Sequence, residues 1–341
     1  MLRKTALNDL KPSSILINKH FYCSLNIGGI VVNIEKILED SGFNSMAPQE
    51  ALSKLSSFEE FYSNEEIIEI CIYIIKNCSN SELIKGVIRF ADSYKDSFIL
   101  HELLNILLLK IKPNIEADDL IDVRVLCAKA ISNYKDTSTV NSLLYCLNNK
   151  SENYKIRLAC ADALGRIGDK YAVAPLINVV QDENEKSVYV KESATFALGL
   201  LGDISAIDPL VSIIEAKQGI YDKFSFLKEK IVEALGKLNI NNQRVLKVFK
   251  MSLMDSSPMV RINTIEALMN SEYDEAPDLI RTALHDPDEE VSKNALIALY
   301  NLIGRDILDE VISLPSYSQF LKDEANIIIS DYEECEDNDN D

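Results

Sequence analysis

Residues 153–216 contain one sequence pattern written twice. The first copy reads IRLACADALGRIGD at 156–169 and AVAPLI at 172–177, and the second reads VKESATFALGLLGD at 190–203 and AIDPLV at 206–211. The offset between the copies is 34 residues throughout. Self-similarity at a period of about 20–50 residues is typical of proteins whose repeats stack along one axis. This stretch therefore predicts a solenoid.

The same pattern continues in weaker form over residues 118–304. Each copy can be aligned on the second residue of an Ala-Leu pair, and in all six copies the residue before this anchor is alanine. An aliphatic residue precedes each anchor by eight positions. The six anchors are Ile131, Leu164, Leu198, Leu235, Leu268 and Leu299. A base stands seven positions before the first five anchors, at Arg124, Arg157, Lys191, Lys228 and Arg261, whereas Ser292 occupies this position in the sixth copy.

These recurring positions have direct physical roles in a pair of packed helices. The alanine lets a neighbouring helix approach closely, and the two aliphatic residues lie on the same face of a 3.6-residue helix. In the pairs Gly168-Asp169 and Gly202-Asp203 the glycine is expected to end one helix and the aspartate to cap the next. Each repeat is therefore predicted to be a helical hairpin that buries its apolar face against the next repeat.

The regions outside the clear repeats divide the rest of the chain. Residues 1–45 do not fit the pattern and predict either a β-hairpin leading into a helix or an irregular arm. Residues 46–117 predict helices with a degenerate repeat, and residues 305–330 predict helices that cap the open end of the stack. The acidic segment 331–341 is expected to be disordered because of its composition.

The bulk composition argues against several classes of protein. The chain has 341 residues and a net charge of −19, which argues against sequence-independent binding of nucleic acid, because such binding relies on lysine and arginine. Its seven cysteines are scattered and form no C-x-x-C pair, as expected in a reducing compartment. No apolar run is long enough to suggest a secretory signal or insertion into a membrane. We therefore expect a cytoplasmic protein.

The repeat text resembles the HEAT repeat, in the subclass named after phycobilisome lyase subunits. The resemblance implies an all-α fold, an α-solenoid in which HEAT-like helical hairpins stack into a right-handed superhelix. It also implies that the recurring base pairs with an aspartate in a ladder between repeats, and Asp182, Asp255 and Asp286 stand at matching loop positions. Under this interpretation Arg124, Arg157 and Arg261 are structural residues.

Two classes of enzyme are built from HEAT-like repeats, and the sequence argues against membership of either class. Deoxyhypusine hydroxylase binds two irons through recurring His-Glu pairs, but the equivalent positions here hold no such pair, and His101-Glu102 is the single one in the chain. HEAT-like DNA glycosylases carry basic faces with aromatic residues, and this chain is acidic and has no tryptophan. No cofactor or metal is expected. A bilin lyase subunit or phycobiliprotein-maturation factor stays open as an alternative, by analogy of the repeat subclass alone.

The remaining hypothesis is a non-enzymatic scaffold that binds another protein on its concave surface. We expect the second helix of each repeat to line this surface, with Tyr171, Asn178, Asp208 and Ser212 among its exposed residues. The next helices contribute the single basic patch of the chain, formed by Arg244, Lys247, Lys250 and Arg281. This patch is either a docking site for an acidic segment or an ordinary solvated helix face.

Overall fold

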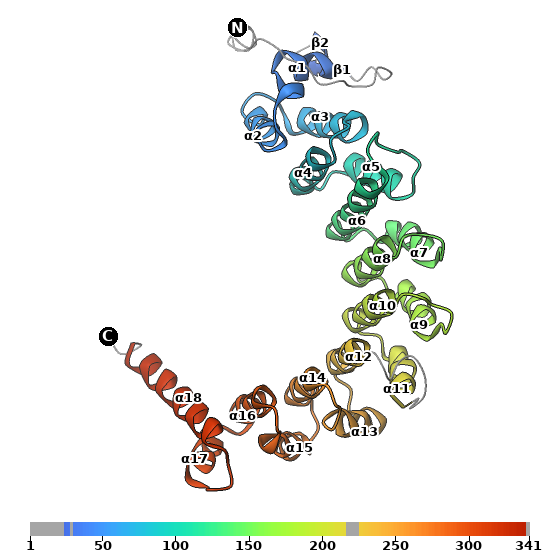
Figure 1. Ribbon diagram of the computed structural model, residues 1–341. Coiled ribbons are helices and arrows are strands. Elements are labelled where there is room, and N and C mark those ends of the chain that lie inside the picture. The colour runs from blue at the N-terminus through green and yellow to red at the C-terminus, as the bar shows by residue number, and fades with distance from the viewer. Residues whose placement is uncertain (1–23, 28–29, 216–224, 339–341) are drawn as a thin grey trace. The chain divides into compact units, whose positions relative to one another are not determined.

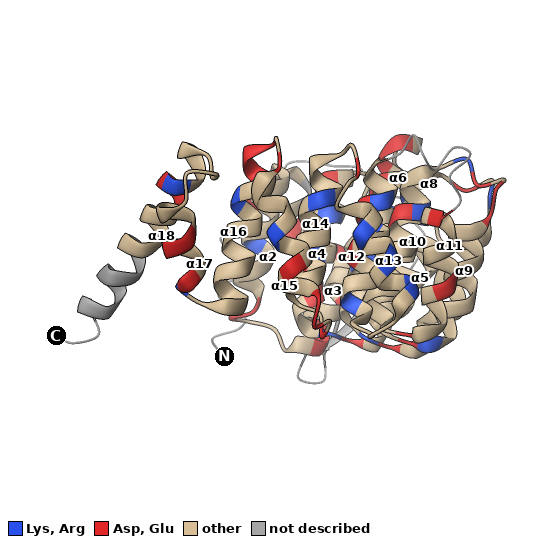
Figure 2. Ribbon diagram, turned by 90° about the horizontal axis from the view of Figure 1, so that it is seen from below, with Lys and Arg blue, Asp and Glu red and all other residues tan. Residues whose placement is uncertain are grey.

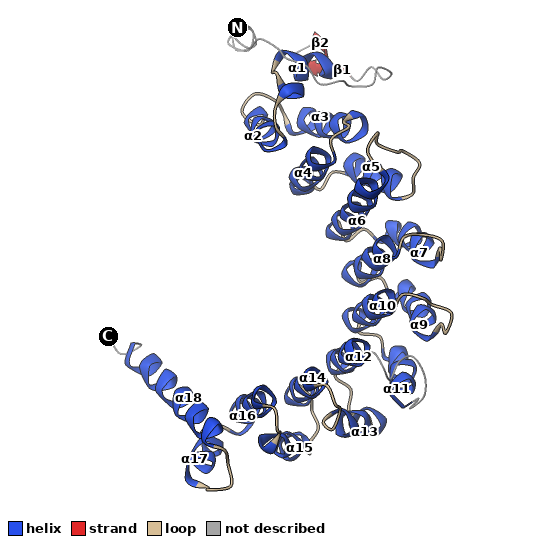
Figure 3. Cartoon of the chain, viewed as in Figure 1, coloured by secondary structure: helices blue, strands red, loops and turns tan. Residues whose placement is uncertain are grey.

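A computed structural model describes residues 24–27, 30–215 and 225–338, and these are mostly helical (Figure 1, Figure 3). Two short strands, β1 (Ser24–Ile27) and β2 (Ile30–Asn33), pair antiparallel and lead directly into helix α1 (Ile34–Asp40). The side chain of Asn33 caps this helix by accepting a hydrogen bond of 2.9 Å from the Glu35 amide. The hairpin alternative is thus confirmed for the paired residues 24–27 and 30–33, and residues 1–23 and 28–29 of the arm lie outside the described residues.

The chain divides into two compact units, residues 1–169 and 170–341. The first unit continues with α2 (Pro48–Phe58), α3 (Asn64–Asn77), α4 (Ser81–Ala91), α5 (Ser97–Leu107), α6 (Ala117–Asn133), α7 (Val140–Asn148) and α8 (Tyr154–Ile167). The second contains α9 (Val173–Gln181), α10 (Val188–Leu201), α11 (Ile207–Glu215), α12 (Ser225–Leu238), α13 (Gln243–Ser252), α14 (Pro258–Met269), α15 (Ala276–Thr282), α16 (Glu289–Ile303), α17 (Asp306–Ser313) and α18 (Gln319–Asn338). Short 3₁₀ helices lie between them, at η2 (Phe43–Ser45), η3 (Asp92–Tyr94), η4 (Thr137–Thr139), η5 (Lys170–Ala172), η6 (Ile204–Ala206) and η8 (Ala283–His285).

Within each unit the helices form two parallel rows. In the first unit α4, α6 and α8 lie side by side, with α5 against α6 and α7 against α8. In the second unit α10, α12, α14 and α16 form one row, and α9, α11, α13 and α15 form the other (Figure 1). The alanines before all six anchors are buried, as are the anchors themselves. The predicted all-α solenoid of stacked helical hairpins is confirmed.

The expectation about which row faces inward is wrong for the second unit. Taken by itself, this unit bends so that α10, α12, α14 and α16 lie on the inner side, and α9, α11, α13 and α15 lie on the outer side (Figure 1). We expected the second helix of each repeat, which belongs to the outer row, to line the concave wall. The row that carries the recurring alanines and glycines packs more closely than the other row, which is consistent with a bend toward that side.

Two glycines set the close spacing of the inner row. A Cβ atom built on Gly236 of α12 would lie 2.8 Å from the Cβ of Ala267 in α14, and one on Gly199 of α10 would lie 3.1 Å from the Cα of Ala234 in α12. Both distances are shorter than ordinary carbon–carbon contacts. Neither glycine has a left-handed backbone conformation, so the reason for glycine here is the approach of the next helix.

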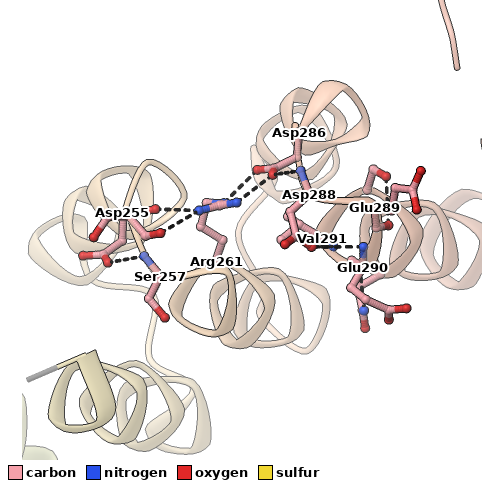
Figure 4. Close-up of polar contacts among 11 residues, drawn as sticks. Asp255, Ser257, Arg261, Asp286, Asp288, Glu289, Glu290 and Val291 are labelled. Carbon is pink, nitrogen blue, oxygen red and sulfur yellow. Dashed lines mark hydrogen bonds and ion pairs between the residues drawn. The ribbon is translucent and has the colours of Figure 1, made fainter.

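The recurring bases form the ladder that the resemblance implied. Arg261 of α14 is 9% exposed, and its Nε and Nη2 atoms donate to the two carboxylate oxygens of Asp286 at 2.8 and 2.7 Å (Figure 4). Its Nη1 donates to the backbone oxygen of Asp255, whose side chain accepts from Lys228 of α12 at 2.9 Å. Arg261 and Lys228 therefore each tie their helix to the loop that precedes the next helix of the row, which confirms the structural interpretation of Arg261.

Arg124 plays the same part in the first unit, with a different acid. It donates to the backbone oxygen of Leu107 and to Glu152, which lies in the loop before α8. Burial raises the pKa of Glu152, but the hydrogen bonds from Arg124 and from the Asn153 amide outweigh this effect and hold the pKa below its ordinary value. Lys191 reaches a backbone oxygen in the same manner, that of Val180 at 3.1 Å.

Both glycines of the doubled stretch, and the aspartate of its second copy, have the expected positions. Gly168 and Gly202 follow the last residues of α8 and α10 with φ of 86° and 65°, a left-handed conformation that glycine adopts without strain. Asp203 then caps η6 by accepting from the Ser205 amide at 3.0 Å. These contacts confirm the predicted ends of both helices.

The C-terminal helices cover the last repeat and extend further than expected. Lys293 of α16 is paired with Glu324 of α18 at 3.0 Å, and α18 runs to Asn338, eight residues into the segment predicted to be disordered. Glutamate is a good helix former, and extending a helix that has already begun costs far less than starting one. Residues 339–341 of the predicted tail lie outside the described residues.

Replacing Arg261 should strongly destabilise the second unit. Arg261→Met keeps the bulk of the side chain but leaves the Asp286 carboxylate, whose side chain is 8% exposed, without its partner. Breaking a buried ion pair on one side costs about 3–5 kcal/mol. We expect a loss of this size in the free energy of unfolding, measured by urea denaturation. Arg89→Met is the matched control, because Arg89 is exposed and has no ion pair among the described residues, and it should change the free energy by less than about 0.5 kcal/mol.

Gly236→Ala should lower stability although alanine is the better helix former. In an exposed helix this change would gain roughly 0.5–1 kcal/mol, but here the new methyl group meets Ala267. We expect a net loss of about 1–3 kcal/mol, the usual cost of overpacking. Adding Ala267→Gly should relieve the contact, so the two changes together should cost less than the sum of the separate changes in thermal denaturation. Strict additivity would contradict the close-approach explanation.

Candidate protein-binding surfaces of the second unit

All eight residues that the sequence analysis assigned to a binding surface lie in the outer row of the second unit or in the turn before it. Tyr171 belongs to η5 and is 66% exposed. The others are distributed over four helices, with Asn178 in α9, Asp208 and Ser212 in α11, Arg244, Lys247 and Lys250 in α13, and Arg281 in α15. They therefore lie on successive elements of the outer row and do not line the inner side of the unit.

The bases of α13 are paired with acids of the preceding outer helix. Arg244 donates from Nη1 to Asp208 at 2.5 Å and from Nη2 to Glu215 at 2.7 Å, and Lys247 lies 3.9 Å from Glu215. The hydrogen bond from Arg244 is the main cause that lowers the pKa of Glu215, and the same bond raises the pKa of Arg244. Both effects favour the charged forms, so α11 and α13 are held together electrostatically.

The remaining two bases pair with acids of the following helices. Lys250 lies 2.5 Å from Glu275, the residue before α15, and Arg281 donates from Nη1 to both oxygens of Glu310 in α17 at 2.6 and 2.7 Å. Tyr317 also donates to Glu310, at 2.8 Å. Figure 2 shows the blue segments of α13 near the red segments of α15. We call this set of pairs the outer charge chain, and it joins consecutive helices of the outer row.

The outer charge chain argues against the basic patch as a docking site for an acidic segment. Every one of its four bases has a carboxylate within 4 Å. An acidic partner would have to displace these carboxylates. The geometry therefore favours a role in holding neighbouring repeats, although exposed pairs of this kind each contribute only about 0–1 kcal/mol.

A second surface, which the sequence analysis missed, lies on the inner row. Tyr189, Phe226 and Met259 are the second residues of α10, α12 and α14, and they are 55%, 65% and 51% exposed. Each precedes the anchor of its repeat by nine positions. The alignment contained this signal, since three successive copies place a large apolar residue at one position. Helices of the inner row cover two sides of α12 and of α14, and helices of the outer row cover a third, so the exposed side of these two helices faces inward (Figure 1).

Acidic residues accompany these apolar side chains. Glu192 of α10 and Glu229 of α12 lie six positions before their anchors, and Glu266 of α14 lies two positions before its anchor. Burial and then the charge of Glu229 raise the pKa of Glu192, while Lys230 lowers it. Glu229 accepts a hydrogen bond from Ser257 at 3.3 Å. Within the described residues none of these three carboxylates forms an ion pair. We call Tyr189, Phe226, Met259, Glu192, Glu229 and Glu266 the inner surface.

The lysines near the inner surface are already paired. Lys230 and Lys237 of α12 both bind Glu233, at 2.7 and 2.6 Å. Both ammonium groups also lie over the ring of Phe196, Lys237 at 4.6 Å and Lys230 at 5.6 Å from its centroid. The Glu233 carboxylate thus binds both lysines. Glu192 and Glu229 therefore form no ion pair with either of them.

The described residues show no arrangement suited to metal binding. Among them no three His, Cys, Asp or Glu side chains are grouped so that they could hold an ion. His101 is exposed, and its neighbour Glu102 is paired with Lys76 at 2.7 Å. Cys127 and Cys160 are completely buried, as core positions should be. No helix in the part of the chain that the structure describes is both long and apolar enough to cross a membrane.

Comparison with solved structures finds several distant likenesses. The complex of CpcE and CpcF of phycocyanin lyase from Nostoc sp. PCC7120 is 19% identical, with a TM-score of 0.44, over 68% of this chain and 94% of that chain. Human deoxyhypusine hydroxylase in complex with glycerol is 16% identical, with a TM-score of 0.32, over 74% of this chain and 88% of that one. UNC-45 from Drosophila melanogaster is 12% identical, with a TM-score of 0.34, over 84% of this chain and 46% of that one. No curated protein matches the chain.

The family match rests on the sequence itself. A family model of HEAT repeats matches residues 109–189, 143–221 and 217–300, which together span more than half of the chain. These ranges include the doubled stretch and all five recurring bases. They also agree with the stacked hairpins and the base–acid ladder described above. The chain belongs to the HEAT repeat family.

Proposed function

We propose that this protein is a non-enzymatic scaffold or adaptor that binds a protein partner on the concave side of its second unit. The observation that carries the proposal is the inner surface, where three large apolar side chains recur at one position of three neighbouring helices and are each more than half exposed. Soluble proteins expose single apolar residues routinely, but contiguous apolar patches mark interaction sites. Repeat stacks present such extended surfaces to partners.

In this proposal the outer charge chain holds neighbouring repeats together and does not bind the partner. Its bases already bind carboxylates of the same chain, so a partner gains little from them. The inner surface offers exposed apolar area, and aromatic and methionine side chains are enriched at the centres of protein interfaces. We propose that the protein binds its partner in the cytoplasm. The free thiols of the described cysteines support this location.

The two surfaces can be separated by a capture experiment. Tyr189→Ser, Phe226→Ser and Met259→Ser together remove the apolar side chains of the inner surface, and all three are exposed enough for the fold to tolerate the change. We expect capture of partners from a cell extract to fall by at least about tenfold, since truncating a central interface residue costs about 1–2 kcal/mol or more. Quantitative mass spectrometry of the captured proteins measures this change.

A matched triple variant of the outer row provides the control. Arg244→Ala, Lys247→Ala and Lys250→Ala remove exposed bases of α13, and capture should stay within a factor of about two of the wild type, given the small worth of exposed pairs. Circular dichroism checks that both variants stay helical. A loss of capture in the outer variant alone would move the site to the outer row, and a wild-type chain that captures no protein would disprove the scaffold function.

A further inference from the structure

The inner surface has a charge as well as an apolar character. Glu192, Glu229 and Glu266 lie on the three helices that carry the exposed apolar residues, and no ion pair involves them among the described residues. The nearby bases Lys230 and Lys237 are both taken by Glu233. A partner that covers this surface must therefore bring cations to the carboxylates, or leave negative charge without a partner at the interface.

The spacing of the apolar residues indicates the shape of the partner. Tyr189, Phe226 and Met259 come from successive helices of one row, and packed helices lie roughly 8–10 Å apart. In an α-helix two residues seven positions apart lie on the same face and roughly 10 Å apart along the axis. In an extended strand this distance corresponds to about three residues, whose side chains point to opposite faces. A bound helix therefore matches the spacing of Tyr189, Phe226 and Met259, and its apolar side chains all point toward them.

We propose that the inner surface binds a basic amphipathic helix, laid across α10, α12 and α14, with apolar residues seven positions apart and lysine or arginine beside them. The apolar side chains of the helix cover Tyr189, Phe226 and Met259, and its cations pair with Glu192, Glu229 and Glu266. This inference rests on the proposed function and names the chemistry of the partner. It also explains why a strongly acidic chain keeps these carboxylates free of ion pairs with its own lysines.

Binding of synthetic helices to the full chain tests the inference. The probe is a fluorescent 18-residue peptide with leucine at three positions spaced by seven and lysine along the edges of that face. Two control peptides carry either glutamate in place of the lysines, or the same composition in scrambled order. In fluorescence anisotropy at low salt we expect the basic amphipathic peptide to bind at least about tenfold more tightly than either control, with the advantage over the acidic control shrinking as salt rises.

Charge-neutral variants then locate the binding. Glu192→Gln with Glu229→Gln should weaken binding of the basic peptide by roughly tenfold, the effect of losing two partly exposed ion pairs. Glu183→Gln with Glu272→Gln is the matched control, because it removes the same charge from exposed positions outside the inner surface, and it should leave binding within a factor of about two. Equal effects of the two variants would show attraction to net charge alone and would overturn the inference.

The outcomes separate this inference from the proposed function. If the scrambled or acidic peptide binds as well as the basic amphipathic one, while the inner-surface serine variant still loses its captured partner, the chemistry assigned to the partner is wrong and the scaffold function stands. If the wild-type chain captures no protein from an extract, the scaffold function fails, and tight binding of the peptide would then report affinity without a biological partner. Preferential binding that depends on Glu192 and Glu229 supports the inference.

Discussion

The contact on which the second unit depends is the one between a buried base and the loop before the next inner helix. Arg261 holds Asp286 through two parallel hydrogen bonds, a geometry that the planar guanidinium suits better than any other side chain (Figure 4). The carboxylate in turn accepts from the Asp288 amide at 2.9 Å and so fixes the approach to α16. One residue therefore connects the helix that carries it with the start of its neighbour. The alanines and glycines allow these helices to approach closely, and the base holds the loop before the next helix in place.

This arrangement separates the positions that build the stack from those that are free to vary. The alanine and the anchor are buried in all six repeats, and the base is buried in four of the five repeats that carry it, so changing these residues would disturb the spacing of the row. The positions nine and six before each anchor face solvent or are only partly covered, so stacking does not dictate their identity. In α10, α12 and α14 they nevertheless carry large apolar and acidic residues. Binding is the simplest reason for apolar side chains to recur where packing does not require them.

Periodicity made the stacking predictable from the sequence, and it made little else predictable. Arg261, Ala267 and Gly202 stand at fixed distances from their anchors, so each copy confirmed the interpretation of the others. The partners of the outer bases have no such regularity. Glu215, Glu275 and Glu310 lie 25 to 29 residues from the bases they bind, and no spacing in the sequence marks them. The basic patch therefore looked unpaired. The side toward which the unit bends was also hidden, because it depends on the relative spacing of two rows.

The length of α18 shows that composition alone is a poor predictor of disorder in the acidic C-terminal segment. An acidic segment with few apolar residues predicts disorder when it stands alone, because it cannot bury enough surface to order the chain. Here the segment continues a helix that begins at Gln319 and is anchored by the buried side chains of Leu321 and Ala325. The nucleus is already formed, and each further residue adds one hydrogen bond for one ordered residue. A composition that is disordered in isolation is thus helical when it follows an anchored turn, and the same logic governs the whole chain, where each hairpin is stable because its neighbour has already formed.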